Sequence, residues 1–144
     1  MIHFTKAEKK HYDAILHLLK ENNLPISDLD EAKLAHFIVA QKENDVAGCV
    51  GLEIYGTDAL LRSLSVKPSL HNKGLGSQLH EKIVEYARSM GVKNLHLLTT
   101  TAEKFFLKKG FIVTAREKAP VTIQNTKEFK EICGSTSVYM NIRM

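Results

Sequence analysis

One glycine-containing segment, residues 66–77, most constrains the fold of this chain, because a hydrophobic strand pattern enters it and an amphipathic helix pattern leaves it. Gly74 and Gly76 allow backbone conformations and a close approach that a side chain would obstruct, so several peptide N–H groups can point at one anion. The positive end of the following helix adds to that attraction. The segment therefore predicts a loop that binds pyrophosphate, with an ordinary tight turn as the simpler alternative.

Spacing excludes two other glycine motifs. A dinucleotide-binding fingerprint needs a third glycine where this chain has Leu79, and a nucleotide P-loop needs Lys and then Ser or Thr directly after its last glycine. What remains is His71-Asn72-Lys73-Gly74-Leu75-Gly76. It resembles the acyl-CoA loop of the GNAT acetyltransferases, whose pattern is Arg or Gln, two residues, Gly, any residue, then Gly or Ala. His71 departs from the usual first residue of that pattern.

The resemblance implies that acetyl-CoA is the co-substrate. In the GNAT fold two neighbouring strands splay apart and pantetheine inserts between them, which places the gap here between segments 64–66 and 97–98. Backbone groups at Leu64 and Val66 are then expected to pair with the pantetheine amides. The residues implied in cofactor binding are Leu64, Ser65, Val66, His71, Asn72, Lys73, Gly74, Leu75, Gly76, Ser77 and Phe106.

A second similarity to the GNAT family lies between residues 95 and 111, where a short strand pattern precedes a compact helix pattern closed by Gly110-Phe111. The family's corresponding pattern is an Asn-x-x-Ala-x-x-Phe-Tyr helix followed by Gly-Phe. Phe106 stands where the family often has the Tyr that protonates the departing CoA thiolate. Phenylalanine cannot donate a proton, so water or another group must do so, unless a thiolate leaving group is tolerated.

Segments 60–66 and 97–106 resemble a small GNAT group associated with arsenic resistance and, more distantly, the transferase domain of N-acetylglutamate synthases. Segment 51–56 and the tail 126–129, followed by Cys133, fit the arsenic-resistance group better. The resemblance implies direct transfer of an acetyl group to the amino group of a small amino-acid-like acceptor. An arsenical or phosphinic glutamate analogue is one such acceptor.

The candidate catalytic residue is Glu53, an acid within an apolar run on the strand expected beside the cofactor strand. A positioned general base contributes about 10²–10⁴-fold to such a reaction. The alternative for Glu53 is an outward-facing charge. Arg62 is a candidate for binding an acceptor carboxylate, or else for a surface ion pair with Glu53. Thr99 and Thr100 could place hydroxyl groups near the thioester, although threonine is also a common strand residue.

The chain has 144 residues, of which 44% are hydrophobic and 25% charged, and this predicts one globular domain spanning residues 1–144. The expected fold is α/β, with a mixed central sheet of six or seven strands flanked by about four helices. Helix patterns cover residues 5–21, 74–90, 101–109 and 125–132, with a shorter one within 27–35. Strand patterns cover residues 36–40, 46–55, 59–66, 95–99, 111–116 and 136–142.

The net charge of +4 suits an anionic ligand such as CoA, and the scattered lysines give no indication of nucleic-acid binding. The seven histidines and two cysteines show no paired metal-ligand spacing, so we expect no metal. The apolar runs are too short for a membrane span and residues 1–4 lack a signal-peptide layout, which favours a cytoplasmic protein without a membrane partner. A homodimer stays open.

Two other functions fit parts of the sequence. The unusual His71 and Phe106 are consistent with a non-catalytic acyl-CoA-binding or regulatory module. A protein N-terminal acetyltransferase would share the cofactor loop but needs a groove that is open to a peptide. Thiol release across a panel of acceptors distinguishes the binding module from a small-molecule acetyltransferase. Acceptors with a blocked or extended carboxylate distinguish the N-terminal acetyltransferase, since the small-molecule enzyme should not use them.

Overall fold

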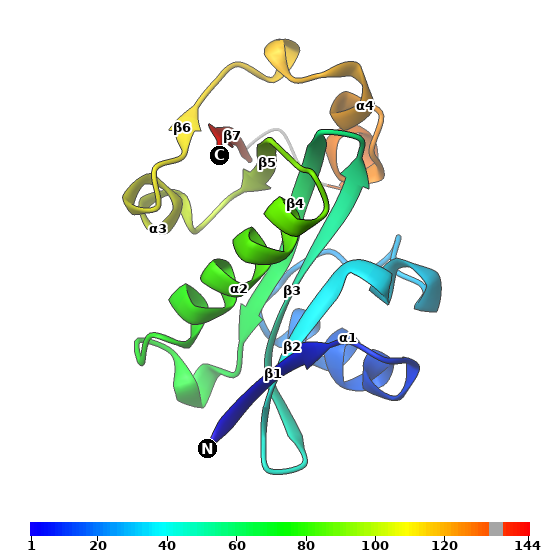
Figure 1. Ribbon diagram of the computed structural model, residues 1–144, viewed down its shortest axis with the longest axis vertical. Helices are drawn as coiled ribbons and strands as arrows, with labels where there is room; N and C mark the ends of the chain where they lie inside the picture. Colours follow the sequence, from blue (N-terminus) through cyan, green and yellow to red (C-terminus); the bar gives the residue numbers. More distant parts are fainter. Residues whose placement is uncertain (133–136) are drawn as a thin grey trace.

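The computed structural model describes residues 1–132 and 137–144 and contains a seven-stranded sheet in the order β1-β2-β3-β4-β5-β7-β6 (Figure 1). Only β4 and β5 pair in parallel, and the other neighbours are antiparallel. The predicted mixed sheet is confirmed. Its strands are Ile2–Lys6 (β1), Phe37–Lys42 (β2), Asp45–Tyr55 (β3), Asp58–Val66 (β4), Asn94–Thr99 (β5), Ile112–Val113 (β6) and Val138–Arg143 (β7).

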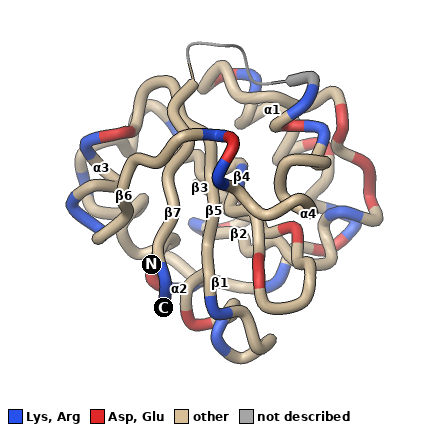
Figure 2. Tube along the Cα trace, turned by 90° about the horizontal axis from the view of Figure 1, so that it is seen from above, with Lys and Arg blue, Asp and Glu red and all other residues tan. Residues whose placement is uncertain are grey.

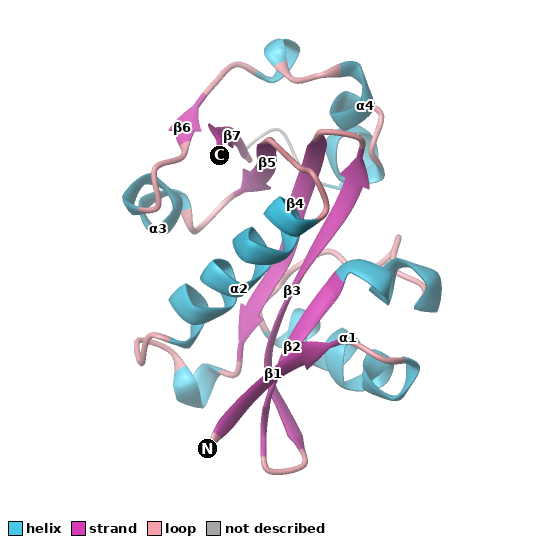
Figure 3. Ribbon diagram, in the orientation of Figure 1, coloured by secondary structure: helices cyan, strands magenta, loops and turns pink. Residues whose placement is uncertain are grey.

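Short helical turns connect the larger elements of the fold (Figure 3). The α-helices are Tyr12–Glu21 (α1), Leu75–Ser89 (α2), Glu103–Lys108 (α3) and Val121–Gln124 (α4). Four 3-10 turns, Lys9–His11, Glu31–His36, Pro68–Leu70 and Arg116–Lys118, and one π-helix, Glu128–Ile132, complete the described helical segments.

The two longest helices cover opposite faces of the sheet (Figure 1). Successive side chains of a strand point to opposite faces. In β2, Ile38 accordingly packs in the cluster formed with α2, whereas Phe37 and Val39 pack in the cluster formed with α1. Helix α4 lies on the face opposite α2, where Ile123 packs with Leu60. The central strands are therefore buried on both sides, which gives the site a rigid frame.

Strands β4 and β5 part soon after they begin. Their pairing ends at Leu60↔His96, and the β3–β4 register shifts between Cys49 and Gly51. Ser63 lies in this irregularity with φ +62°, and its carbonyl accepts a hydrogen bond from the Cys49 thiol. A bulge of this kind bends its strand. The bend separates β4 from β5 and produces the predicted splay.

The predicted helix start at Thr5 is wrong. Thr5 belongs to β1, where it pairs with Val39 of β2, and α1 begins only at Tyr12. The helix pattern over 5–21 is local and could not reveal that residues 2–6 pair with a distant strand, and that pairing satisfies a whole row of backbone groups. Within α2 the apolar residues at helical spacing, Leu75, Leu79, Ile83 and Ala87, are buried, whereas Met90 is 46% exposed because the helix ends at Ser89.

The C-terminal third also differs from the prediction. The strand expected over 111–116 is reduced to the two residues of β6. The helix expected over 125–132 is replaced by the shorter π-helix Glu128–Ile132, and α4 precedes the predicted range. Before the π-helix, the Thr126 hydroxyl accepts a 3.4 Å hydrogen bond from the Phe129 amide. Cys133 and the predicted strand start at Thr136 lie outside the described residues.

Candidate functional site

Three adjoining cavities form one channel along the splay of β4 and β5. The loop cavity, of about 570 Å³, lies beside segment 64–77, and the splay cavity, of about 150 Å³, lies between segments 61–64 and 97–99. The acidic cavity, of about 170 Å³, lies beyond them and contains Arg62 and Glu128. Neighbouring cavities share lining residues, so we call the three together the channel. The shared residues are Asn22, Leu64, Thr101 and Ala102 at one junction, and Leu24, Arg62, Ser63, Leu98, Thr99 and Thr101 at the other.

The glycine loop has the backbone that anion binding requires. Gly74 adopts φ +83° as the residue that precedes α2, and Asn72 adopts φ +65°. A left-handed conformation of this kind is easily reached by glycine and asparagine. It turns the chain sharply into α2, whose free N–H groups and positive end point at the loop cavity. An anionic group is therefore favoured there.

The predicted cofactor residues gather along this channel. All of them except Lys73 and Phe106 line the loop cavity, Phe106 lines the splay cavity, and the exposed Lys73 lines none of the three cavities. His71 has a structural contact of its own, because its Nε2 donates to the Val66 carbonyl at 2.8 Å. Asn22 donates to the same oxygen at 3.2 Å. That carbonyl is thus occupied, and Leu64, in the register shift, is the better placed of the two for pairing with pantetheine.

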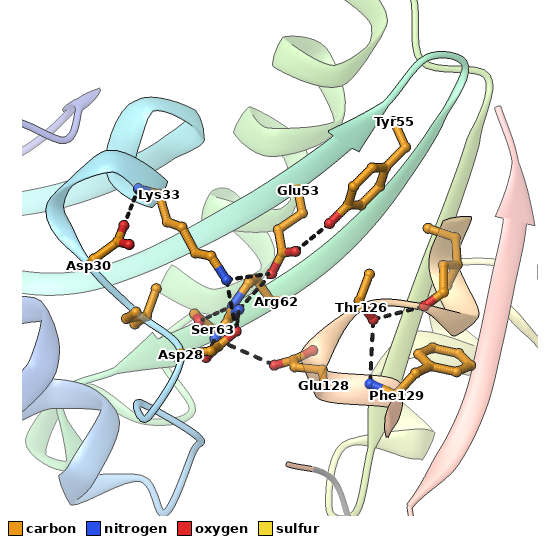
Figure 4. A network of polar contacts seen from close by, with 12 residues as sticks. Asp28, Asp30, Lys33, Glu53, Tyr55, Arg62, Ser63, Thr126, Glu128 and Phe129 are labelled. Atoms are coloured by element: carbon orange, nitrogen blue, oxygen red, sulfur yellow. Dashed lines mark hydrogen bonds and ion pairs between the residues drawn. The ribbon is translucent and has the colours of Figure 1, made fainter. Parts of the chain in front are cut away.

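Arg62 is the centre of a largely buried group of charged side chains, which we call the charge cluster: Asp28, Lys33, Glu53, Arg62 and Glu128 (Figure 4). The Arg62 guanidinium is completely buried and donates from Nη2 to Asp28 Oδ1 at 2.8 Å and from Nη1 to Glu53 Oε2 at 2.6 Å. Its Nε donates to the Ser63 hydroxyl at 3.1 Å. Lys33 Nζ donates to Asp28 Oδ2 at 3.2 Å.

The carboxyl groups of this cluster differ in proton affinity. Burial opposes ionisation of Asp28, but hydrogen bonding to Arg62 and the charges of Arg62 and Lys33 lower its pKa to about 2. Burial raises the pKa of Glu128 to about 7, against the attraction of Arg62 and with the help of nearby Asp28 and Glu53. Asp28 is therefore ionised at neutral pH, whereas Glu128 is divided between its two protonation states.

The raised pKa of Glu128 makes stability depend on pH. Its ordinary pKa is 4.5, so from about pH 4.5 to 7 the folded chain keeps a proton that the unfolded chain has lost. Glu128 therefore lowers the free energy of unfolding more and more as the pH rises, and this loss reaches its full value above about pH 7. Glutamine does not ionise, so we expect the free energy of unfolding of Glu128→Gln, relative to that of the parent chain, to rise by about 2 kcal/mol from pH 5 to pH 8.

Thermal unfolding of both chains at each pH measures that gain, and their difference cancels the contribution of the buried histidines. The exposed Glu117 lies in the same C-terminal third, so Glu117→Gln is a matched control that should show no such gain. A stability difference between Glu128→Gln and the parent chain that is constant with pH would contradict the proposed burial of an ionisable carboxyl.

The structure brings three of the four predicted catalytic and substrate residues into the channel. Arg62 and Thr99 line the splay and acidic cavities, and Thr100 lines the acidic cavity. Thr99 Oγ1 also accepts a 2.9 Å hydrogen bond from the Ala102 amide. Glu53 lies behind Arg62 and is not among the residues that line the channel. Its Oε1 accepts from the Tyr55 hydroxyl at 2.6 Å.

These contacts bear on the roles assigned to Glu53 and Arg62, which stay predictions. Arg62 forms the predicted ion pair with Glu53, but the pair is buried. Binding an acceptor carboxylate at Arg62 would require one of its carboxylate partners to be exchanged. Both oxygens of Glu53 are engaged, so the geometry gives it a role in holding Arg62.

Sequence reasoning missed Asp28 and Glu128. Asp28 fell within the short helix pattern of residues 27–35, and Glu128 was interpreted only as part of the helix pattern over 125–132 and of the tail 126–129. No spacing rule links positions 28, 62 and 128, since the fold alone brings them together. Asp28 and Glu128 are each an acid beside an apolar residue, a pattern too common to identify a site.

Other chemistries find no support among the described residues. Residues 1–132 and 137–144 contain no group of three or more side chains suited to hold a metal ion. In those ranges no helix combines the length and apolar character needed to cross a bilayer. Basic and acidic positions are interspersed along the trace (Figure 2). Cys49 is completely buried, and burial raises the pKa of its thiol to about 12, so it is protonated at neutral pH.

Known proteins are similar to this chain in sequence. The sequence pattern of the family described as acetyltransferase (GNAT) domain matches residues 33–113. An amino-acid acetyltransferase from Ralstonia nicotianae is 32% identical over 92 residues, which cover 62% of this chain and 20% of that protein. One from Pseudomonas fluorescens is 34% identical over 92 residues, covering 62% of this chain and 21% of that protein. The matched region thus spans about a fifth of the length of these relatives.

Solved structures share the fold. N-acetylglutamate synthase from Neisseria gonorrhoeae, complexed with coenzyme A and N-acetyl-glutamate, superposes with a TM-score of 0.87 at 21% identity, covering 99% of this chain and 35% of that one. A GNAT acetyltransferase from Staphylococcus aureus superposes with a TM-score of 0.77 at 16% identity, covering 99% of each chain. The similarity to these structures extends over almost all of the chain, from β1 to β7.

Proposed function

Because this chain belongs to the GNAT acetyltransferase family, we propose that it transfers the acetyl group of acetyl-CoA to the amino group of a small amino-acid-like acceptor. The observation that carries the proposal is the channel of adjoining cavities, which has the glycine loop at one end and the charge cluster at the other. A cofactor with a pyrophosphate at one end and a thioester at the other suits such a channel.

In this arrangement pyrophosphate lies on the N–H groups at Gly74–Ser77 and pantetheine runs through the splay cavity beside Leu64. The acetyl group then faces the acidic cavity. The acceptor nitrogen attacks the thioester carbonyl, the C–N bond forms, the C–S bond breaks, and CoA leaves as a thiolate that is protonated by water or by the acceptor's released proton. A neutral, buried Cys49 supports direct attack over a covalent acyl-enzyme through that residue.

The acceptor is proposed from two features. The acidic cavity, of about 170 Å³, is smaller than the cavities of about 300–1,000 Å³ that usually bind drug-sized ligands, so a small metabolite fits it better. The relatives are amino-acid acetyltransferases, and the synthase structure holds N-acetyl-glutamate. Glutamate and its arsenical or phosphinic analogues are therefore the first acceptors to test. A cytoplasmic location and a homodimer stay predictions.

The test is release of free thiol from acetyl-CoA, together with mass spectrometry of the product. The panel contains glutamate, its phosphinic and arsinic analogues, other small amines, amine-blocked versions of each and short peptides with free N-termini. We expect turnover with at least one small amino-acid-like amine and none with the blocked versions. Preferential turnover of peptides would favour N-terminal acetylation, and tight acetyl-CoA binding without turnover would favour a binding module. No acetyl-CoA binding would refute the proposal.

A further inference from the structure

Glu128 is the carboxyl group of the charge cluster that reaches the channel. It begins the π-helix Glu128–Ile132, is 5% exposed, and lines the acidic cavity. Thr126 fixes the turn before it, because its hydroxyl donates to the Ile123 carbonyl at 2.8 Å. Phe129 then packs edge-on against Tyr139 of β7, with ring centroids 5.4 Å apart. The carboxyl group is therefore placed by packed neighbours on both sides.

The charges that face Glu128 come from three other segments. Arg62 of β4 is the nearest, with Nη2 3.7 Å from Glu128 Oε1, which is beyond hydrogen-bond distance. The charges of Asp28, Glu53 of β3 and Lys33 also act on it. The two cations are balanced by Asp28 and Glu53, which Arg62 contacts directly. An ionised Glu128 then leaves one negative charge in excess, and a bound ammonium group would neutralise it.

We propose that Glu128 binds the ammonium group of the acceptor and removes its proton before attack on acetyl-CoA. This inference rests on the function proposed above. One N–H bond of the ammonium breaks, its proton passes to the Glu128 carboxylate, and the electron pair stays on nitrogen. The neutral amine attacks the thioester, the C–N bond forms and the C–S bond breaks. The second proton leaves with the CoA thiolate, and Glu128 returns its proton to solvent.

The environment of Glu128 suits this task better than that of Glu53. A general base works best when its pKa lies near the working pH, and burial raises the pKa of Glu128 to about 7. Glu53 instead uses both oxygens, one with Tyr55 and one with Arg62, and does not line the channel. Glu53 is thus a positioning residue for Arg62, and Glu128 is the group that would meet the acceptor.

The experiment compares the parent chain with Glu128→Gln, using kcat/KM from about pH 5.5 to 9 with the best acceptor from the panel. A strongly basic amine is almost entirely protonated near pH 7, so we expect Glu128→Gln to lower kcat/KM about 10²-fold or more and to abolish the pH limb near 7. A weakly basic amine is already neutral near pH 7, so kcat/KM with such an amine should fall less than about tenfold in Glu128→Gln. Acetyl-CoA affinity should stay unchanged.

Three further variants separate a chemical role from a structural one. Glu128→Asp keeps a carboxyl group and should retain the pH limb at a reduced rate, whereas the exposed Glu117→Gln should behave as the parent chain. Equal losses for the two classes of amine, or an intact pH limb in Glu128→Gln, would overturn the inference while leaving acetyl transfer established. So would loss of that limb in Glu53→Gln alone. A parent chain inactive with every amine would overturn both proposals.

Discussion

Replacing Arg62 with leucine is expected to destabilise the protein by about 3–5 kcal/mol at pH 7. The substitution removes the one guanidinium that donates to Asp28 and Glu53 and faces Glu128, so acidic side chains remain buried together without their main partner. Lys33 alone cannot replace it, since its ammonium contacts Asp28 at 3.2 Å but is 3.9 Å from Glu53. Breaking a buried pair costs more than the pair itself contributes, because the remaining charge stays uncompensated.

Urea unfolding at equilibrium measures this loss. The matched control is Arg88→Leu on the exposed side of α2, which should change the free energy of unfolding by less than about 1 kcal/mol. Arg62→Lys should also be costly, because an ammonium cannot reproduce the two-nitrogen contact with Asp28. A loss near that of Arg88→Leu would mean that Arg62 is not buried among these carboxyl groups.

Replacing Gly76 with glutamate is expected to weaken acetyl-CoA binding about 100-fold, which corresponds to roughly 2.7 kcal/mol. Gly76 lines the loop cavity in the first turn of α2, so the new carboxylate would face the cofactor's phosphates. Two like charges about 4 Å apart near a protein surface repel by about 4 kcal/mol. The fold should not suffer, because an acidic residue in the first turn of a helix is favourable.

Calorimetric titration with acetyl-CoA checks this expectation. Gly76→Ala is the matched control, since a Cβ at this position would approach only Phe105, at 3.9 Å, and leave the loop unchanged. We expect the alanine variant to bind within about threefold of the parent chain. Equal affinity in all three chains would show that the pyrophosphate does not lie on this loop.

The sequence was most informative where one segment contains a complete local pattern. The strand, loop and helix over 59–90 follow from apolar periodicity and from the glycines at 74, 76 and 91, and the structure has them within about two residues. The glycine loop and the splayed strands of the channel lie within or beside this segment, so these parts of the channel can be predicted as well. Most residues that line the loop cavity were accordingly predicted from the sequence, whereas Asn22, Leu70, Thr101, Ala102 and Phe105 were not.

The charge cluster was beyond such reasoning for a physical reason. It joins segments around residues 28, 53, 62 and 128, which no local periodicity connects. β1 was missed on the same ground, because its partner in the sheet is residues 38–42. Arg62 and Glu53 were correctly recognised as unusual charges in apolar strands, but their buried partners come from the fold. Long-range contacts decide what a charged residue can do.

The most direct test of the central claim is to map the amide chemical shifts of the 16.2 kDa chain during titration with acetyl-CoA. The account predicts the largest changes at Gly74, Gly76, Ser77 and Leu64, along the channel. An unreactive analogue of an acceptor that the protein acetylates is then added. It should change the amide chemical shifts around Glu128. Changes confined to β1 or to the exposed side of α2, or no changes at all, would contradict the claim that this channel is the acetyl-CoA site.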